Sequence, residues 1–557
     1  MTAVWWREWR MLSHSLSVVA LAIISRLVCV AYAVLSDLLI PDHEAEGVLL
    51  FHFPPECSHS NLLFAFTKWD SAHFLLVAEV GWEDPQRIYS HAFFPLYPLL
   101  IGWFSALLEP VFVAPSLLCT AELRVLVGMT LSNTAFVIAA WCLYRLGERV
   151  LLDPSLAHAS ACFFCAAPAS VFFSTCYADA SFAAATFGGL LLLELERPWL
   201  AALCLSLASS CRANGVLNVL PVVYASVRRL GRALDFHGVL AMSTPKAHKG
   251  ERRQGRVTML VVFEMATGLV QSVLVLAPYA AWQVIGHRRV CGGAQSSSDA
   301  RSSFASLIVG FAVALRTVLT DTLLLFSSPG MKPTPTRVSR PASSAWLSAN
   351  WCEPRALGGA GDRPWQWYWW SPPPDLYALV QREYWGVGLF RYYEFKQLPN
   401  FMLAAPVLMM WACATADALA VLRRRSCGLS VREAAHEALG LRRQRAEQGS
   451  GAGDYEDDKS KTKEGDGALT PRTLVYFLQW SALSLLSLLC ANVQVTTRLV
   501  GAACPPVYWV MAHILLRRET RSSRWLGGRQ MSAWVARYAA AYVVIGTALH
   551  SNGFPWT

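Results

Sequence analysis

The sequence predicts an all-α integral membrane protein that crosses the bilayer many times. Of its 557 residues, 54% are hydrophobic and only 15% are charged, whereas soluble proteins carry roughly 25% charged residues. The mean hydropathy is +0.35, and the 22 Trp suit aromatic belts at membrane faces. Because lipid offers no hydrogen bonds to the backbone, the long apolar stretches are expected to fold as helices.

About eleven apolar stretches are candidate transmembrane helices, each of which needs about 20 residues to span the bilayer. Two of them, 179–194 and 503–516, are short for this role. A further stretch, 302–326, is interrupted by Arg316 and Asp321, so it is either an extra span or a surface helix. The candidates are 15–37, 93–113, 124–145, 157–175, 179–194, 198–224, 257–285, 400–421, 472–492, 503–516 and 531–550.

Basic loops orient the chain, because Lys and Arg are enriched in cytoplasmic loops. Placing 225–256, 422–471 and 517–530 in the cytoplasm puts the first loop, 38–92, and the large loop, 286–399, on the opposite face. The net charge of +10 comes largely from such loops, so no nucleic-acid partner is expected.

One membrane domain accounts for most of the chain. Its main part is 1–427, and its last helices lie in 471–557. Between them, 428–470 is charged and Gly-rich, and is predicted to be a disordered cytoplasmic loop because it cannot bury enough apolar area. Ser/Pro/Gly-rich stretches predict an insertion within 291–345, whose role stays open.

Trp69-Asp70 opens a run dense in aromatic, His and acidic residues after a long apolar stretch. Ionisable groups avoid lipid, so the run is expected at a membrane face or in a wet cavity. There Asp70 would serve as a general base on a sugar hydroxyl. The alternative is an interfacial Trp beside a solvated Asp.

Three further motifs break apolar stretches. His91 and Phe94 belong to an aromatic-Pro run that either caps a helix or binds a phosphate or sugar. Tyr177 and Asp179 end another such run, and the span count places Asp179 near the cytoplasmic side, which argues against a catalytic role beside Asp70. Arg212 and Asn214 fall inside the 198–224 stretch, where the arginine would bind phosphate or pair with Asp179.

The stretch 384–400 combines aromatic rings, cations and amides just before a predicted span. It is either a sugar-phosphate site or an amphipathic interfacial helix. A similar polar group lies at the end of the 472–492 span. The candidate substrate-binding residues of these two regions are Trp385, Arg391, Tyr392, Lys396, Gln397, Asn400, Gln494 and Arg498.

No metal and no cofactor is expected. The Cys and His do not fall at metal-ligand spacings, and no Asp-x-Asp lies on the face opposite the cytoplasm to hold a divalent ion. If the loops that carry Cys291 and Cys352 face an oxidising compartment, those two cysteines could form a disulfide.

Taken in order, these motifs resemble one family. The order is Trp69-Asp70, Ala92-Phe-Phe-Pro95, Pro168-Ala-Ser-Val-Phe172, Tyr177-Ala-Asp179, Arg212-Ala-Asn-Gly215, Tyr384-Trp-Gly-Val-Gly388, Lys396-Gln-Leu-Pro-Asn-Phe401, Val493-Gln-Val-Thr-Thr-Arg498 and the ending Asn552-Gly-Phe-Pro-Trp-Thr557. It is similar to that of the GPI mannosyltransferase 2 family, from the first span to the end of the chain.

The resemblance implies a C-type glycosyltransferase (GT-C) fold in the endoplasmic-reticulum membrane with a lumenal catalytic face. It implies dolichol-phosphate mannose as the donor, a mannosyl-glucosaminyl-phosphatidylinositol (GPI) glycolipid as the acceptor, and an α-1,6 linkage made with inversion. Asp70 matches the family's first-loop carboxylate, whereas Asp179 stands where the family usually has Glu. Membrane lipids are expected partners, and the need for a small membrane partner subunit stays open.

Two other functions fit the same residues. In a transporter or flippase, Arg212 and Asp179 would be groups of the transport pathway. In a non-catalytic subunit of a glycosylation complex, the chain would only scaffold an enzyme. Neutralising Asp70 separates the transferase from the other two functions, because only the transferase needs a base there.

Overall fold

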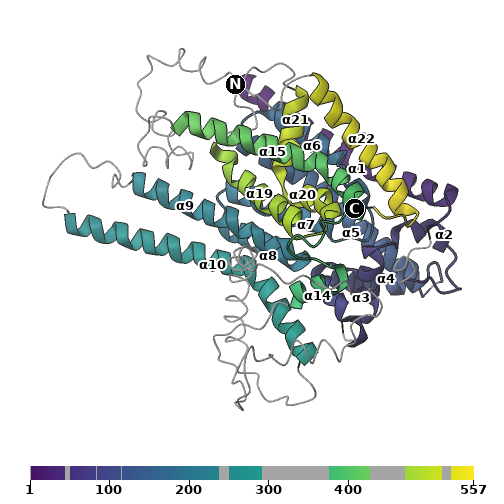
Figure 1. Ribbon diagram of the computed structural model, residues 1–557. Helices are drawn as coiled ribbons and strands as arrows, with labels where there is room; N and C mark the ends of the chain where they lie inside the picture. The colour runs from purple at the N-terminus through teal and green to yellow at the C-terminus, as the bar shows by residue number, and fades with distance from the viewer. Residues whose placement is uncertain are drawn as a thin grey trace.

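The computed structural model describes residues 2–43, 51–82, 85–114, 116–236, 250–291, 376–426, 471–516 and 529–556. Within these ranges the chain is helical and contains no strand, as Figure 1 shows. Five described helices are long and apolar enough to cross a membrane, and a bent pair, Val493–Ala503 with Pro505–Leu516, makes a sixth. The prediction of an all-α polytopic membrane protein is therefore confirmed, while the number of eleven spans stays a prediction.

The first and last helices lie side by side in the bundle, although they come from opposite ends of the chain (Figure 1). These are α1 (Thr2–Leu39) and α22 (Arg529–Ser551). The end of α1 meets the end of α22 where Asn552 Nδ2 donates to Ser36 Oγ at 2.9 Å. We call this end of the bundle, where Asp70 also lies, the site end.

The segment between α1 and α5 begins and ends on one side of the bundle. Cys57, before these helices, forms a disulfide with Cys119, after them. The prediction that 93–113 crosses the membrane is therefore wrong: the helix it forms returns to the same side, because a disulfide holds the two flanks together. The helices concerned are α2 (Ser60–Leu63), η2 (Phe64–Phe66), α3 (Asp70–Val80), η3 (Pro85–Ala92) and α4 (Leu96–Phe112).

This non-crossing helix changes the placement of Asp179. α5 (Thr120–Val150) leads away from the site end, α6 (Pro154–Cys165) and η4 (Ser170–Phe173) lead back, and α7 (Asp179–Glu194) starts there. Ser132 in α5 donates to the carbonyl oxygen of Tyr177 at 3.1 Å, and this bond holds the start of α7 beside α5. The prediction that Asp179 lies near the opposite, cytoplasmic side from Asp70 is therefore wrong, since it rested on counting 93–113 as a span.

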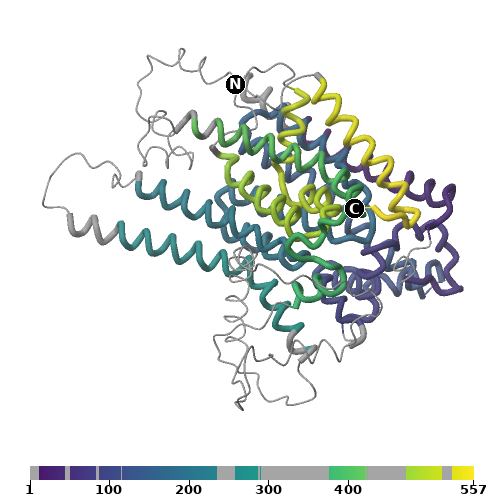
Figure 2. Tube along the Cα trace, in the orientation of Figure 1, coloured from purple at the N-terminus to yellow at the C-terminus, as the bar shows by residue number. Residues whose placement is uncertain are grey.

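The predicted span 198–224 is two helices rather than one. α8 (Pro198–Cys211) ends at Arg212, whose backbone is extended, and η5 (Ala213–Asn218) leads into α9 (Val219–Phe236). α9 and α10 (Gly250–Cys291) lie side by side and continue through much of the predicted basic loop 225–256 (Figures 1 and 2). Residues 198–224 therefore add one crossing to the predicted count, and 93–113 removes one. The side of the membrane predicted for later segments is unchanged.

The remaining helices complete the bundle around α7. The described residues leave out the predicted disordered loop 428–470, the stretch 302–326 predicted to be an extra span or a surface helix, and Cys352 of the predicted disulfide. A large core of buried apolar side chains joins α5, α6, α7 and α21, and includes Phe164 and Trp509. The helices are α14 (Leu376–Trp385), η9 (Phe395–Gln397), α15 (Leu398–Ser426), η10 (Pro471–Thr473), α19 (Leu474–Leu489), η11 (Val493–Val495), α20 (Thr496–Ala503) and α21 (Pro505–Leu516).

Candidate functional site

Four side chains of alternating charge meet at the site end. Arg498 donates from Nη2 to Asp70 Oδ2 at 2.6 Å and from Nε to Asp179 Oδ1 at 3.2 Å. Arg212 pairs with the same oxygen of Asp179. Asp70 is the most open of the four, with 33% of its side chain exposed, whereas Asp179 is 1% exposed. The row thus places three paired charges of low exposure behind one accessible carboxylate.

Each of the four stands at a helix boundary, which explains how distant segments converge. Asp70 begins α3, Asp179 begins α7, and Arg212 ends α8. Carboxylates at the first residue of a helix face the positive end of its dipole and are stabilised there. Arg498 lies in the first turn of α20, and a bend of 87° at the other end of this helix leads into α21.

The Arg498 guanidinium determines the charge state of Asp70. Burial by itself opposes ionisation of this carboxyl, but the ion pair and hydrogen bond with Arg498 outweigh it and hold its pKa below the ordinary value. His73, one turn along α3, has a pKa lowered by burial and stacks on Phe93 at 4.6 Å between ring centroids. Asp70 is therefore an ionised carboxylate that can accept a proton, although the ion pair makes it a weak base.

Aromatic rings enclose the ionic row. The Arg498 guanidinium lies 4.8 Å from the ring centroid of Tyr177 and 5.2 Å from that of Phe172, which are cation–π distances. The hydroxyl of Tyr177 accepts from the backbone N–H of Asp70 at 3.2 Å and lies 3.2 Å from His550 Nε2. Tyr177, predicted to bind substrate, thus contacts the same carboxylate residue from behind.

The amides predicted in two separate motifs form one network. Tyr392 donates to Gln494 Oε1 at 2.7 Å, and Asn400 Nδ2 donates to both the Tyr392 hydroxyl and Gln397 Oε1 at 2.7 Å. Gln494 is one helical turn before Arg498. This network therefore joins the 384–400 stretch to the helix that carries the guanidinium of the ionic row.

Other predicted residues lie farther out or pack between helices. Lys396 pairs with Glu394 at 2.6 Å on an exposed surface, and Arg391 is exposed as well. The carbonyl oxygen of Trp385 accepts from Asn492 at 3.3 Å. The rings of His91 and Phe94, from the aromatic-Pro run, are buried against Trp282 of α10. Burial lowers the pKa of the His91 imidazole to about 4.

Four predicted residues carry a polar atom that is buried without a hydrogen-bond partner among the described residues. Such atoms are uncommon, because each costs about 1–3 kcal/mol. Trp69 precedes Asp70 in the sequence, and Asp179 shares the Arg498 guanidinium with Asp70. Asn214 lies two residues after Arg212. The atoms are Trp69 Nε1, His91 Nδ1, Asp179 Oδ2 and Asn214 Nδ2.

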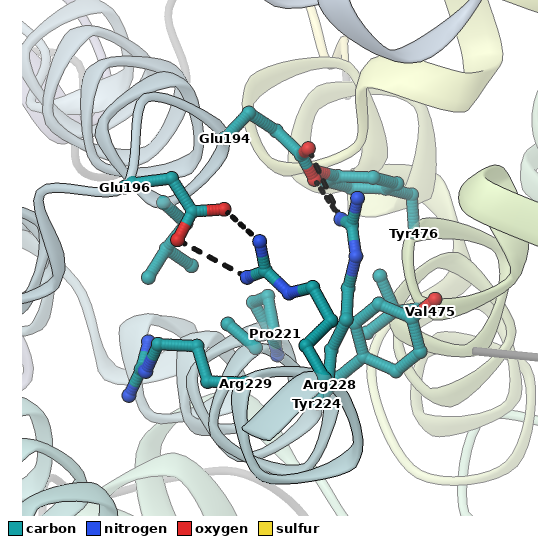
Figure 3. A pocket seen from close by; sticks show the side chains of 11 residues that line it. Glu194, Glu196, Pro221, Tyr224, Arg228, Arg229, Val475 and Tyr476 are labelled. Atoms are coloured by element: carbon teal, nitrogen blue, oxygen red, sulfur yellow. Dashed lines mark hydrogen bonds and ion pairs between the residues drawn. The ribbon is translucent and has the colours of Figure 1, made fainter. Parts of the chain in front are cut away.

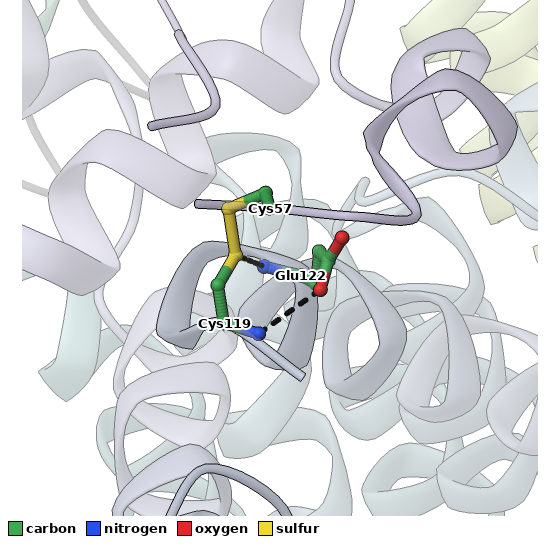
Figure 4. Close-up of side chains that lie close together, drawn as sticks. All are labelled: Cys57, Cys119 and Glu122. Carbon is green, nitrogen blue, oxygen red and sulfur yellow. Dashed lines mark hydrogen bonds between the residues drawn. A yellow bond between two sulfur atoms is a disulfide. The ribbon is translucent and has the colours of Figure 1, made fainter. Parts of the chain in front are cut away.

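A group of metal-ligand type at the site end is already occupied by other bonds. Cys57, Cys119 and Glu122 lie close together (Figure 4), but the two sulfur atoms form the disulfide. Glu122 Oε2 accepts from the backbone N–H of Cys119 at 2.9 Å as part of a helix cap. With no thiolate left and the carboxylate engaged, these three residues do not fit a metal ion.

A pocket lies at the opposite end of the bundle, where α7, α9 and α19 meet (Figure 3). Its cations are paired: Arg228 with Glu194 at 3.2 Å, and Arg232 with Glu196 at 2.8 Å. The guanidinium groups there are therefore compensated by carboxylates from the neighbouring helix.

Sequence reasoning missed two residues that touch the site. Lys68 was missed because a lysine beside Trp69-Asp70 is also typical of an ordinary interfacial charge. His550 was hidden in the last predicted span, although the Asn552–Thr557 ending had already marked that region as part of the motif order. Only the folded contacts single them out: Lys68 donates to the carbonyl oxygen of Ser551, and His550 contacts the Tyr177 hydroxyl.

Fold and site together define a polytopic helical membrane protein with a buried ionic row behind an accessible carboxylate. The chain belongs to the family described as mannosyltransferase (PIG-V), whose model matches residues 15–557. It is thus an enzyme, a glycosyltransferase of the mannosyltransferase class.

Relatives with curated names match almost their whole length. The GPI alpha-1,6-mannosyltransferase 2 of Cricetulus griseus is 28% identical over 99% of this chain and 100% of its own. The protein of the same name from Homo sapiens is 27% identical over 97% of this chain and 98% of its own. Among solved structures, the Archaeoglobus fulgidus oligosaccharyltransferase is 13% identical, with a TM-score of 0.37 over 95% of this chain and 55% of that chain.

Proposed function

We propose that this protein adds the second mannose, in α-1,6 linkage, to the mannosyl-glucosaminyl-phosphatidylinositol intermediate of GPI-anchor biosynthesis. The donor is dolichol-phosphate mannose, the fold is of the C-type glycosyltransferase class, and the enzyme resides in the endoplasmic-reticulum membrane. The names of full-length relatives support the acceptor and the linkage. Membership in a mannosyltransferase family disfavours the transporter and scaffold functions.

The reaction inverts the anomeric carbon in one displacement. The acceptor hydroxyl oxygen attacks C1 of the donor mannose, its proton passes to a carboxylate oxygen of Asp70, and the C1–O bond to phosphate breaks. Dolichyl phosphate leaves with the bonding electron pair. Because phosphate is a good leaving group, one general base suffices and no acid is required. The single observation behind the assignment is an Asp70 side chain one-third exposed and held ionised by Arg498.

The cations of the row suit the donor phosphate. Arg498 and Arg212 both pair with the carboxylate of Asp179, so their guanidinium groups lie close together. A guanidinium forms paired hydrogen bonds to phosphate oxygens. Lys396 and Arg391 are further candidates for this contact, with Trp385 and Tyr392 as apolar walls. No cofactor or metal is proposed, since a monophosphate donor is neutralised by such side chains.

The Cys57–Cys119 disulfide supports a lumenal site end. Disulfides persist in the endoplasmic-reticulum lumen and are rare in the reducing cytosol. Both cysteines lie on the stretch that also carries Asp70. The basic loops 225–256 and 422–471 would then face the cytoplasm, in agreement with the positive-inside rule.

The test is to delete the gene and identify the accumulating glycolipid by mass spectrometry. We expect an intermediate with one mannose, which disappears when the wild-type chain is restored and persists with Asp70→Asn. Accumulation of an intermediate with two or more mannoses, or with none, would contradict the proposed step.

A further inference from the structure

A strained residue separates the buried Lys68 from the carboxylate of Asp70. Trp69 has φ 58° and ψ −131°, in the left-handed half of backbone space that an L-residue with a bulky side chain rarely adopts. Such a conformation is unfavourable and persists only where neighbouring contacts hold it in place. The contacts of Lys68 and Asp70 therefore show what holds this turn.

On the N-terminal side, Lys68 is fastened by three acceptors. Its side chain is 0% exposed, and Nζ donates to Asp37 Oδ1 at 2.6 Å, to Asp42, and to the carbonyl oxygen of Ser551. The last is a C-terminal carbonyl of α22, where a cation is favoured by the unpaired carbonyls and the helix dipole. An ammonium has three N–H groups, and all three are used.

On the C-terminal side, Asp70 is fastened through Tyr177. The Asp70 N–H donates to the Tyr177 hydroxyl, so the single hydrogen of that hydroxyl is free to point at His550 Nε2, 3.2 Å away. The buried imidazole of His550, 1% exposed, is therefore the hydrogen-bond partner of the Tyr177 hydroxyl, as donor or acceptor according to its tautomer. His550 and Ser551 are neighbours, so the last turn of α22 holds both flanks of Trp69.

Resting on the proposed function, we propose that the last turn of α22 is a positioning unit for the general base: His550 acts through Tyr177, and Ser551 through Lys68, to hold Asp70 at its reacting angle. None of these groups reacts with substrate in this assignment. The unit explains why the strained Trp69 turn is stable, and why α22 is fastened to α1 by Asn552 at the same place.

The experiment compares His550→Leu, which removes the hydrogen-bond partner of Tyr177, with His550→Gln, which keeps a side chain able to donate or accept. Both are assayed as full-length protein in membranes, per amount of folded enzyme, with His513→Leu as the matched loss of a buried imidazole in α21. We expect His550→Leu to lower kcat by roughly 10- to 100-fold, as small misplacements of a reacting group do. Both KM values should stay within about threefold, and His550→Gln should restore most of kcat, because only the position of Asp70 changes.

A second variant tests the chain of contacts. Tyr177→Phe breaks the same link, so the double variant with His550→Leu should lose little more than either single one. Wild-type kcat per folded enzyme in His550→Leu would overturn the proposal, as would losses that multiply in the double variant. If His550→Leu does not accumulate, a wild-type kcat in Tyr177→Phe would overturn it equally. Absence of mannosyl transfer by wild-type protein would instead defeat the proposed function.

Discussion

Arg498 donates to Asp70 at 2.6 Å across 428 residues of sequence. The pair joins the start of α3 to the first turn of α20. A guanidinium in this position lowers the pKa of Asp70, and under the proposed function it would also donate hydrogen bonds to the donor phosphate. The predictions below separate these roles.

Asp70→Asn should lower kcat on the order of 10²–10⁴-fold, because it removes the proton acceptor while keeping the shape of the side chain. Protein level should hold. The matched control is Glu79→Gln on the same helix, whose carboxylate pairs with Arg124 away from the ionic row. Transfer of radiolabelled mannose in membranes measures both. Wild-type activity in Asp70→Asn would remove Asp70 from the mechanism.

Arg498→Gln should move the acid limb of the pH–kcat/KM profile to higher pH. In the wild type the guanidinium lowers the pKa of Asp70 against the effect of burial, so wild-type activity should persist as pH falls toward the ordinary Asp range near 4. Without the guanidinium, burial raises that pKa, and Asp70 becomes protonated at a higher pH. Arg124→Gln serves as the control. An unmoved acid limb would show that Arg498 does not determine the charge of the base.

Lys396→Ala should raise the KM for the donor more than the KM for the acceptor, if Lys396 contacts the donor phosphate. Charge-assisted hydrogen bonds contribute roughly 1.5–3 kcal/mol, which corresponds to about tenfold or more in KM. Its observed partner, Glu394, is exposed, so the pair can open at little cost. Donor kinetics identical to wild type would show that Lys396 only contacts lipid headgroups.

Replacing Cys57 and Cys119 by Ser should lower the thermal stability in detergent. The disulfide closes a segment with a sequence separation of 62, and bridges of this kind typically contribute 2–4 kcal/mol. Cys204→Ser, at a free cysteine, should have little effect. Thiol alkylation with mass spectrometry checks the pairing. Modification of both cysteines in unreduced membranes would contradict the disulfide and its support for a lumenal site end.

EDTA should leave mannosyl transfer unchanged, because Arg and Lys side chains suffice to neutralise a monophosphate donor. The assay should run beside a glycosyltransferase with an Asp-x-Asp metal site, which must lose activity under the same chelation. Loss of activity that one specific cation restores would refute metal independence.

The sequence alone determined the membrane class, the helical architecture and the residues of the ionic row. Composition reports the transfer of apolar side chains into lipid, and lipid leaves the backbone little choice but helix. Asp70, Asp179, Arg212 and Arg498 each drew attention as ionisable groups beside apolar stretches, where an uncompensated charge is costly.

Only the tertiary structure decided which of these groups meet. Hydropathy cannot tell a helix that crosses the bilayer from one that returns to the same side. Counting 93–113 as a span therefore placed Asp179 on the wrong side of the membrane. Hydropathy also could not show that Asp179 pairs with both Arg212 and Arg498, or that His550 is linked to Asp70 through the Tyr177 hydroxyl. Apolar pattern is a property of one segment at a time, whereas an ion pair depends on the packing of helices hundreds of residues apart.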